Sequence, residues 1–286
     1  MFFQTGGVAE SIYARVRDGI KEHELPGRAF IEELWASAAP FLDPDLAARA
    51  PSNGLVPSFW ELYLAHVLKQ QGIRVVPRNE RSPRRKGPDL FAQSPSVWIE
   101  AVAATPGIGP HALQWGEGKV PDTKILLRLG TAVSAKVVQL KKHGDAGFVR
   151  QDQATVIAVS GAMLPYRFSE ERVPRVVRTV LGIGHLVLTY SRTTGDLTDR
   201  GLEYCDQVTK DGQRAVRTDI FLTDECAHVS GLLYSASCWV HHPASPGTEF
   251  VLVHNPHARI PLPRGWLPVG TEYWVEHDDL CCVAHS

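Results

Sequence analysis

The chain has 286 residues, of which 44% are hydrophobic and 21% charged, and its formal net charge is −1. This length can bury a full hydrophobic core in one large domain, or in one domain with an extension. A net charge near zero argues against a protein that coats nucleic acid without specificity, and five cysteines without a C-x-x-C pair suggest neither a disulfide framework nor a zinc ribbon.

The sequence predicts no contact with a membrane. It contains no run of roughly 18 apolar residues, the length that a membrane-spanning helix needs. The first residues, MFFQTGGVAESIYARVRDG, lack a basic leader followed by an apolar stretch. We therefore expect a cytoplasmic protein with reduced thiols.

Helices are expected in the first part of the chain. Residues 8–50 contain two stretches with apolar residues at helical spacing, and they predict an accessory helical layer over residues 1–57. The next stretch, PSFWELYLAHVLKQQG, is apolar around most of a helical circumference and predicts a buried helix. Ser58, three residues before Glu61, fits the N-cap of a capping box at its start.

Residues 58–190 predict an α/β core. IRVVP predicts a strand, RNERSPRRKG a basic loop, and DLFAQSPSVWIEAVA a hairpin. A helix is expected from about Asp122 to His143, followed by a buried strand in ATVIAVS, a short helix in RVVRTVL and a strand in HLVLTYS. The order of elements is therefore helix, three strands, helix, strand.

The last part of the chain, residues 191–286, predicts a β-rich extension of the same domain. Its strands are expected in HVSGLLYSASCWV, TEFVLVHNP and EYWVEH, and they need a sheet to complete. The histidine pairs His241–His242 and His254–His257 have no acid or cysteine at recognisable spacing, so we do not expect them to bind metal. No serine has the context of a hydrolase nucleophile.

Asp89 and Glu100 stand at the two ends of the predicted hairpin. If QSPS forms its connection, Ala92 faces Val97, and the same register places Asp89 opposite Glu100. Two like charges there repel each other, and a divalent cation such as magnesium would remove the repulsion. The alternative is that Asp89 is a turn residue and Glu100 lies on a solvated strand face.

The chain contains FWELYLAHVL, GPDLFA and VWIEAV, followed by a long helix with Lys and Gln. Over roughly residues 58–160 this array resembles the core of the PD-(D/E)XK nuclease superfamily, the restriction-endonuclease-like fold. The resemblance implies a phosphodiesterase that acts on nucleic acid, with DNA as the expected substrate and Mg²⁺ or Mn²⁺ as cofactor. It implies that Asp89 and Glu100 bind the metal with the carbonyl of Ala101. It also implies that Glu61 adds an outer ligand, although a capping box would explain Glu61 equally. These residues are also compatible with a homodimer.

The lysine of the family motif is absent, because Val102 occupies the position two residues after Glu100. Some members of the superfamily supply this lysine from the following helix. In this chain Lys136 falls inside the apolar stripe of that helix, where an ammonium is costly unless it meets an anion. Lys136 is therefore our candidate for the displaced lysine, with Gln139 in a supporting position. Alternatively, Lys136 extends from the edge of the stripe into water.

The basic loop offers a second functional prediction. Arginine binds phosphate oxygens well, so a basic cluster beside two acids suits a nucleic-acid backbone. A solvated loop without a partner is the alternative. The candidate nucleic-acid ligands are Arg78, Arg81, Arg84, Arg85 and Lys86.

Three functional hypotheses follow from these residues. The first is a metal-dependent nuclease of restriction or repair type, in which Lys136 stabilises the attacking hydroxide or the charge of the transition state. The second, motivated by Val102, is a catalytically inactive nuclease-fold protein that binds nucleic acid or a protein partner. The third is a structural or regulatory protein that binds neither metal nor nucleic acid.

Overall fold

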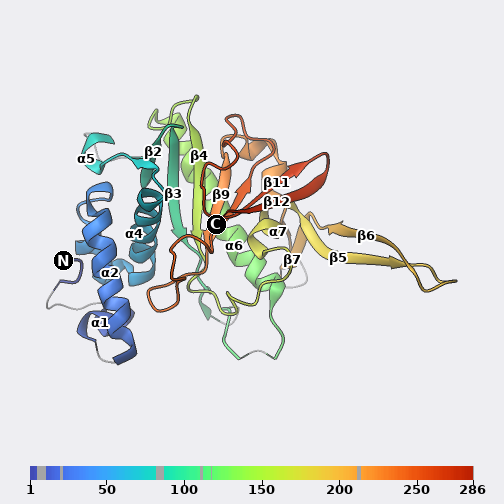
Figure 1. Ribbon diagram of the computed structural model, residues 1–286, viewed down its shortest axis with the longest axis horizontal. Helices are drawn as coiled ribbons and strands as arrows, with labels where there is room; N and C mark the ends of the chain where they lie inside the picture. The colour runs from blue at the N-terminus through green and yellow to red at the C-terminus, as the bar shows by residue number, and fades with distance from the viewer. Residues whose placement is uncertain are drawn as a thin grey trace.

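The computed structural model describes residues 1–4, 11–19, 22–81, 87–109, 112–116, 118–210 and 214–285. It shows a mixed α/β protein in which helices cover both faces of one large sheet (Figure 1). Among the described residues, no helix is long and apolar enough to span a membrane.

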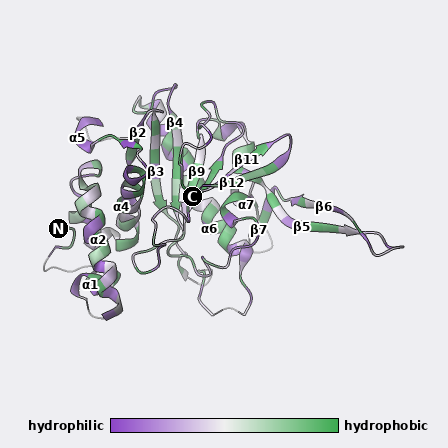
Figure 2. Cartoon of the chain, viewed as in Figure 1, coloured by the Kyte–Doolittle hydropathy of each residue, from purple (hydrophilic) through white to green (hydrophobic). Residues whose placement is uncertain are grey.

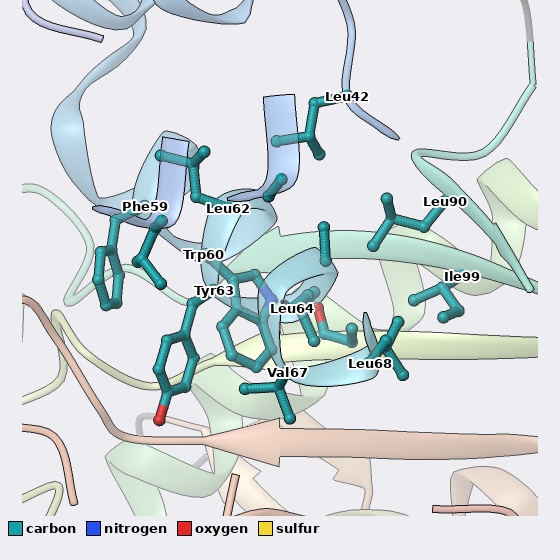
Figure 3. Packing of buried hydrophobic residues seen from close by; sticks show 14 of the residues in the cluster. Leu42, Phe59, Trp60, Leu62, Tyr63, Leu64, Val67, Leu68, Leu90 and Ile99 are labelled. Carbon is teal, nitrogen blue, oxygen red and sulfur yellow. Dashed lines mark hydrogen bonds between the residues drawn. The ribbon is translucent and has the colours of Figure 1, made fainter. Parts of the chain in front are cut away.

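The N-terminal helices form one helical layer. They are α1 (Ser11–Asp18), η1 (Glu22–Glu24), α2 (Leu25–Ala38), η2 (Ala39–Phe41), α3 (Leu46–Asn53) and α4 (Leu55–Gln70). Their buried side chains share a hydrophobic cluster with one face of the sheet. Figure 3 shows its centre, where Trp60, Leu64 and Leu68 of α4 lie close to Leu90 and Ile99 of the sheet.

The burial of α4 is confirmed, but its predicted N-cap is wrong. The N-cap is Gly54, whose φ of 94° suits glycine, and the helix begins at Leu55. Pro57 lies in the first turn, where its missing N–H costs little. Ser58 is therefore already inside the helix, and its hydroxyl donates to the carbonyl of Gly54 at 3.3 Å. A capping box with Glu61 does not form.

The main sheet has eight strands in the order β1-β2-β3-β4-β9-β10-β11-β12. β1, β2 and β3 are antiparallel, β3, β4 and β9 are parallel, and β10 to β12 extend the sheet at its other edge. Figure 2 colours much of its central strands as hydrophobic, and β4 is buried along its full length. The strands are β1 (Arg74–Val75), β2 (Leu90–Gln93), β3 (Val97–Ala103), β4 (Ala154–Ser160), β9 (Gly231–Ser235), β10 (Val251–His254), β11 (Gly270–Glu276) and β12 (Asp279–His285).

The second face of the sheet is covered by α6 (Asp122–Asp145) and α7 (Arg175–Leu181), both of which the sequence predicts. A single turn, α5 (Arg78–Arg81), lies where a loop was expected. Two short 3₁₀ helices, η4 (Ile220–Leu222) and η5 (Asp224–Cys226), precede β9.

Two small ribbons lie outside the main sheet. The strand expected in HLVLTYS is β5 (Ile183–Tyr190), which within the described ranges pairs with β6 (Leu197–Tyr204) and with no strand of the main sheet. The other ribbon consists of β7 (Gln207–Lys210) and β8 (Arg214–Arg217). The sequence patterns indicate neither β6 to β8 nor β12.

Candidate functional site

The hairpin of β2 and β3 positions the two candidate acids. Its register pairs Ala92 with Val97 and Leu90 with Ile99, so the predicted register is confirmed. On the face toward α6 the rings of Phe91 and Trp98 stack with centroids 4.4 Å apart. The paired residues of β2 end at Leu90, and Asp89 is the next residue toward the N-terminus.

Asp89 binds the backbone of the facing strand. Its Oδ2 accepts the N–H of Ala101 at 2.7 Å. This N–H lies beyond the last pair of the ladder, so the carboxylate replaces a backbone partner that β2 no longer supplies. The carbonyl of Ala101 points toward the same edge of β3, because the two polar groups of one strand residue face the same neighbour.

Glu100 lies on the face of β3 toward α6 and is only 2% exposed. Its Oε1 accepts a hydrogen bond from Nζ of Lys136 at 2.6 Å, and the same ammonium donates to Oε1 of Gln139 at 3.0 Å. Nε2 of His143 lies 3.7 Å from the other carboxylate oxygen, Oε2. These three residues of α6 stand at positions i, i+3 and i+7, which share one helical face.

The third acid, Glu61, comes from α4. Its side chain is 13% exposed, and both of its oxygens lie 3.4 Å from Nη2 of Arg49. Burial raises the pKa of Glu61 to about 8, with a further contribution from the negative charge of Asp89. Glu61 therefore does not cap α4, and its charge interacts with the charges of Asp89 and Glu100.

The buried acids also raise one another's pKa values. Burial, followed by repulsion from Asp89, raises the pKa of Glu100 to about 7, although Lys136 acts in the opposite direction. Burial likewise raises the pKa of Asp89, which the N–H of Ala101 and the charge of Lys136 partly offset. The ionised forms of these buried acids are thus disfavoured, because little solvent is present to stabilise their charge.

The donor groups of this cluster suit magnesium in type. Carboxylate and carbonyl oxygens are the ligands that Mg²⁺ takes from proteins, and Asp89, Glu100 and Ala101 supply them. Among the described residues, the buried Oε2 of Glu100 has no hydrogen-bond partner. In the described ranges, however, no three His, Cys, Asp or Glu side chains are grouped closely enough to hold a metal by themselves. Water or substrate oxygens would have to complete the coordination shell.

β3 and α6 thus bring Glu100 and Lys136 together, and Asp89, which directly precedes β2, binds the backbone of β3 one residue beyond Glu100. No family model, curated protein or solved structure matches this chain. The chemistry of the site is therefore inferred from its own side chains.

The first two arginines of the predicted basic loop bind the protein's own groups. Arg78 is 6% exposed, and its guanidinium pairs with Asp43. Nη1 of Arg81 donates to the carbonyl of Asp89 at 2.5 Å, and its Nη2 donates to the carbonyl of Phe41. Burial lowers the pKa of Arg81 to about 10. Here Arg81 fixes the backbone of Asp89. The other candidates, Arg84, Arg85 and Lys86, lie outside the described residues.

His143 is the site residue that the sequence reasoning missed. Its Nε2 is buried and has no hydrogen-bond partner in the part of the chain that the structure describes, and burial lowers the pKa of this histidine. The available signal was its spacing of seven residues from Lys136 on a predicted helix, which places both side chains on one face.

Proposed function

We propose that this chain hydrolyses phosphodiester bonds of nucleic acid, with DNA as the expected substrate and Mg²⁺ or Mn²⁺ as cofactor. The observation that carries the proposal is the contact of 2.6 Å between Lys136 and Glu100, next to Ala101, whose N–H donates to the carboxylate of Asp89 at 2.7 Å. A lysine beside two carboxylates is the constellation of the PD-(D/E)XK nucleases, which the sequence resembles.

The order of elements supports the same proposal. The chain runs α4, β1, the single turn α5, β2, β3, α6, β4, with the first three strands antiparallel and β4 parallel to β3. A restriction-endonuclease-like core has this order of helix, three strands, helix and strand. Val102 packs in the hydrophobic cluster on the α6 side, and the lysine expected at that position is supplied by the helix that covers it.

In the proposed reaction, Asp89, Glu100 and the carbonyl of Ala101 would hold the metal, which supplies a Lewis acid for the scissile phosphate. Lys136 places a positive charge where negative charge develops on the phosphoryl oxygens. Gln139 orients its ammonium by accepting a hydrogen bond at 3.0 Å. Asp89 is held through its own carbonyl by Arg81, and through its carboxylate by the N–H of Ala101.

A nuclease assay with Mg²⁺ or Mn²⁺ on single-stranded and double-stranded DNA and RNA tests the proposal. We expect Asp89→Asn and Lys136→Met each to lower the rate by a factor on the order of 100 or more. Lys142→Met is the matched control, because Lys142 is exposed on the same helix. Cleavage that survives Asp89→Asn unchanged would exclude this mechanism.

A nuclease-like protein without catalysis is the second candidate function, and one specific contact favours it. Nζ of Lys136 lies 2.6 Å from Oε1 of Glu100, so one of the two acids assigned to the metal already has a positively charged partner in the protein. Such a protein would bind nucleic acid or a protein partner. Calorimetry distinguishes the two functions: salt-dependent binding of DNA without binding of Mg²⁺ or Mn²⁺ would favour the inactive protein.

A further inference from the structure

The ribbon of β5 and β6 projects from the body of the protein (Figure 1) and has one apolar face. The register pairs Leu186 with Leu202 and Tyr190 with Leu197, and residues at alternate positions share a face. The side chains on this face are between 40% and 62% exposed, which is unusual for large apolar groups. Its apolar members are Leu186, Leu188, Tyr190, Leu197, Leu202 and Tyr204; we call this set the leucine face. Arg200, the cross-strand partner of Leu188, lies on the same face.

The opposite face of the ribbon is mainly polar. Val187 is its only exposed large apolar side chain among the described residues, and it lies beside Thr189, Asp199 and Glu203. A half-apolar pattern is typical of a strand pair that buries one face against another layer. A two-stranded ribbon is also barely stable without such a layer. The described residues leave the leucine face largely exposed, and only its base, at Leu186 and Leu202, borders the body of the protein.

We propose that two copies of this chain associate through their leucine faces. The two ribbons would pack face to face and antiparallel about a two-fold axis, so that the same patch serves both copies. The six side chains expose on the order of 500 Å² of apolar surface, most of the roughly 800 Å² per partner that a standard interface buries. The contact between the tip of each ribbon and the base of the other would supply the rest.

The base of the ribbon contains a groove that fits such a tip. The groove has a volume of about 520 Å³ and lies between the leucine face, at Leu186 and Leu202, and the turn that joins β11 to β12. Its charged lining residues are Arg172, Arg200, Asp278 and Asp279.

The charges of the ribbon tip complement those of the groove. In the antiparallel arrangement the tip of each ribbon, residues 191–196, lies at the base of the other. Arg192 of one copy would then meet Asp278 and Asp279 of the second, while Asp196 would meet Arg172. Both contacts form twice because of the two-fold axis.

The charge of the ribbon argues against nucleic acid as the partner. From residue 183 to residue 204 it carries two arginines against three acids, Asp196, Asp199 and Glu203. A surface that binds phosphates needs an excess of positive charge. A copy of the same chain offers the apolar side chains that surround Arg200 on this face, together with ends of complementary charge. The dimer therefore does not depend on the nuclease activity proposed above.

Light scattering coupled to size exclusion, over a wide concentration range, tests the apolar contact. We expect a dimer for the wild type and for Val187→Asp, and a monomer for Leu188→Asp. The two positions are neighbours with similar exposure, 46% and 42%, but they lie on opposite faces of β5. A wild type that remains monomeric, or a Leu188→Asp variant that remains dimeric, would overturn the proposal.

Charge reversal tests the position of the tip. Arg192→Glu should weaken the dimer at least about tenfold, the equivalent of one charged contact of about 1.4 kcal/mol. Adding Asp278→Arg and Asp279→Arg to the same chain should restore it. Failure of this restoration would refute the antiparallel arrangement, and circular dichroism of each variant would verify that the fold is intact.

Discussion

Replacing Lys136 by methionine should change how the stability of the protein depends on pH. Nζ of Lys136 lies 2.6 Å from a carboxylate that is 2% exposed, and methionine retains the length of the stem without the charge. The pKa of Glu100 is raised from 4.5 to about 7 by burial and by Asp89, and Lys136 limits the increase. In the variant, the pKa of Glu100 should therefore be higher still.

The sign and size of the effect follow from proton linkage. A carboxyl whose pKa is higher in the folded than in the unfolded chain lowers the free energy of unfolding as the pH rises above the unfolded value. This loss ends near pH 7 in the wild type, whereas in the variant it continues to higher pH. At about 1.4 kcal/mol per pKa unit, the variant should lose about 1 kcal/mol more than the wild type between about pH 7 and pH 8.

Urea unfolding followed by tryptophan fluorescence, at several pH values between about 6 and 8, measures this difference. Only the change with pH is diagnostic, because lost packing around Lys136 contributes at every pH. Lys142→Met, exposed on the same helix, should differ little from the wild type at any pH. A difference between Lys136→Met and wild type that stays constant with pH would show that Lys136 does not stabilise the ionised form of Glu100.

Two further substitutions test the surroundings of Asp89. Asp89→Asn keeps an oxygen for the N–H of Ala101 and removes the charge that raises the pKa of Glu61 and Glu100, so near pH 8 it should increase the free energy of unfolding by about 1 kcal/mol. A less stable variant in urea unfolding would contradict this. Arg81→Ala removes two hydrogen bonds to backbone carbonyls and should cost about 3 kcal/mol. If thermal unfolding showed no loss, Arg81 would not be structural.

The parts of the site that the sequence could predict are those set by short-range periodicity. The hairpin register followed from the position of QSPS between two apolar strands, and it placed Asp89 at the end of β2. The position of Lys136 followed from the apolar stripe of α6, which packs on the same face of the sheet as Glu100. Both inferences needed only the period of a strand or of a helix.

The parts that it could not predict depend on contacts between distant segments. Arg81 binds carbonyls of Phe41 and Asp89, and no local pattern distinguishes it from an arginine that binds phosphate. His143 stands in the last turn of α6, where a histidine is ordinarily explained by the helix dipole. The start of α4 was misplaced because Ser58 and Glu61 match a capping box by spacing alone, while the backbone of Gly54 determined the true N-cap.

Because the lysine stands on α6, the site consists of two structural parts, the hairpin of β2 and β3 and the helix α6. Asp89 and Glu100 share one hairpin, so the backbone ladder fixes the distance between them. Lys136 stands on a separate element, which is held to the sheet by the packing of residues such as Val133 and Leu140 and by the contact between Lys136 and Glu100. A lysine on β3 would move with the acids, whereas this one moves with the helix. A displacement of α6 alone would separate the ammonium from both carboxylates while leaving the pair of acids intact.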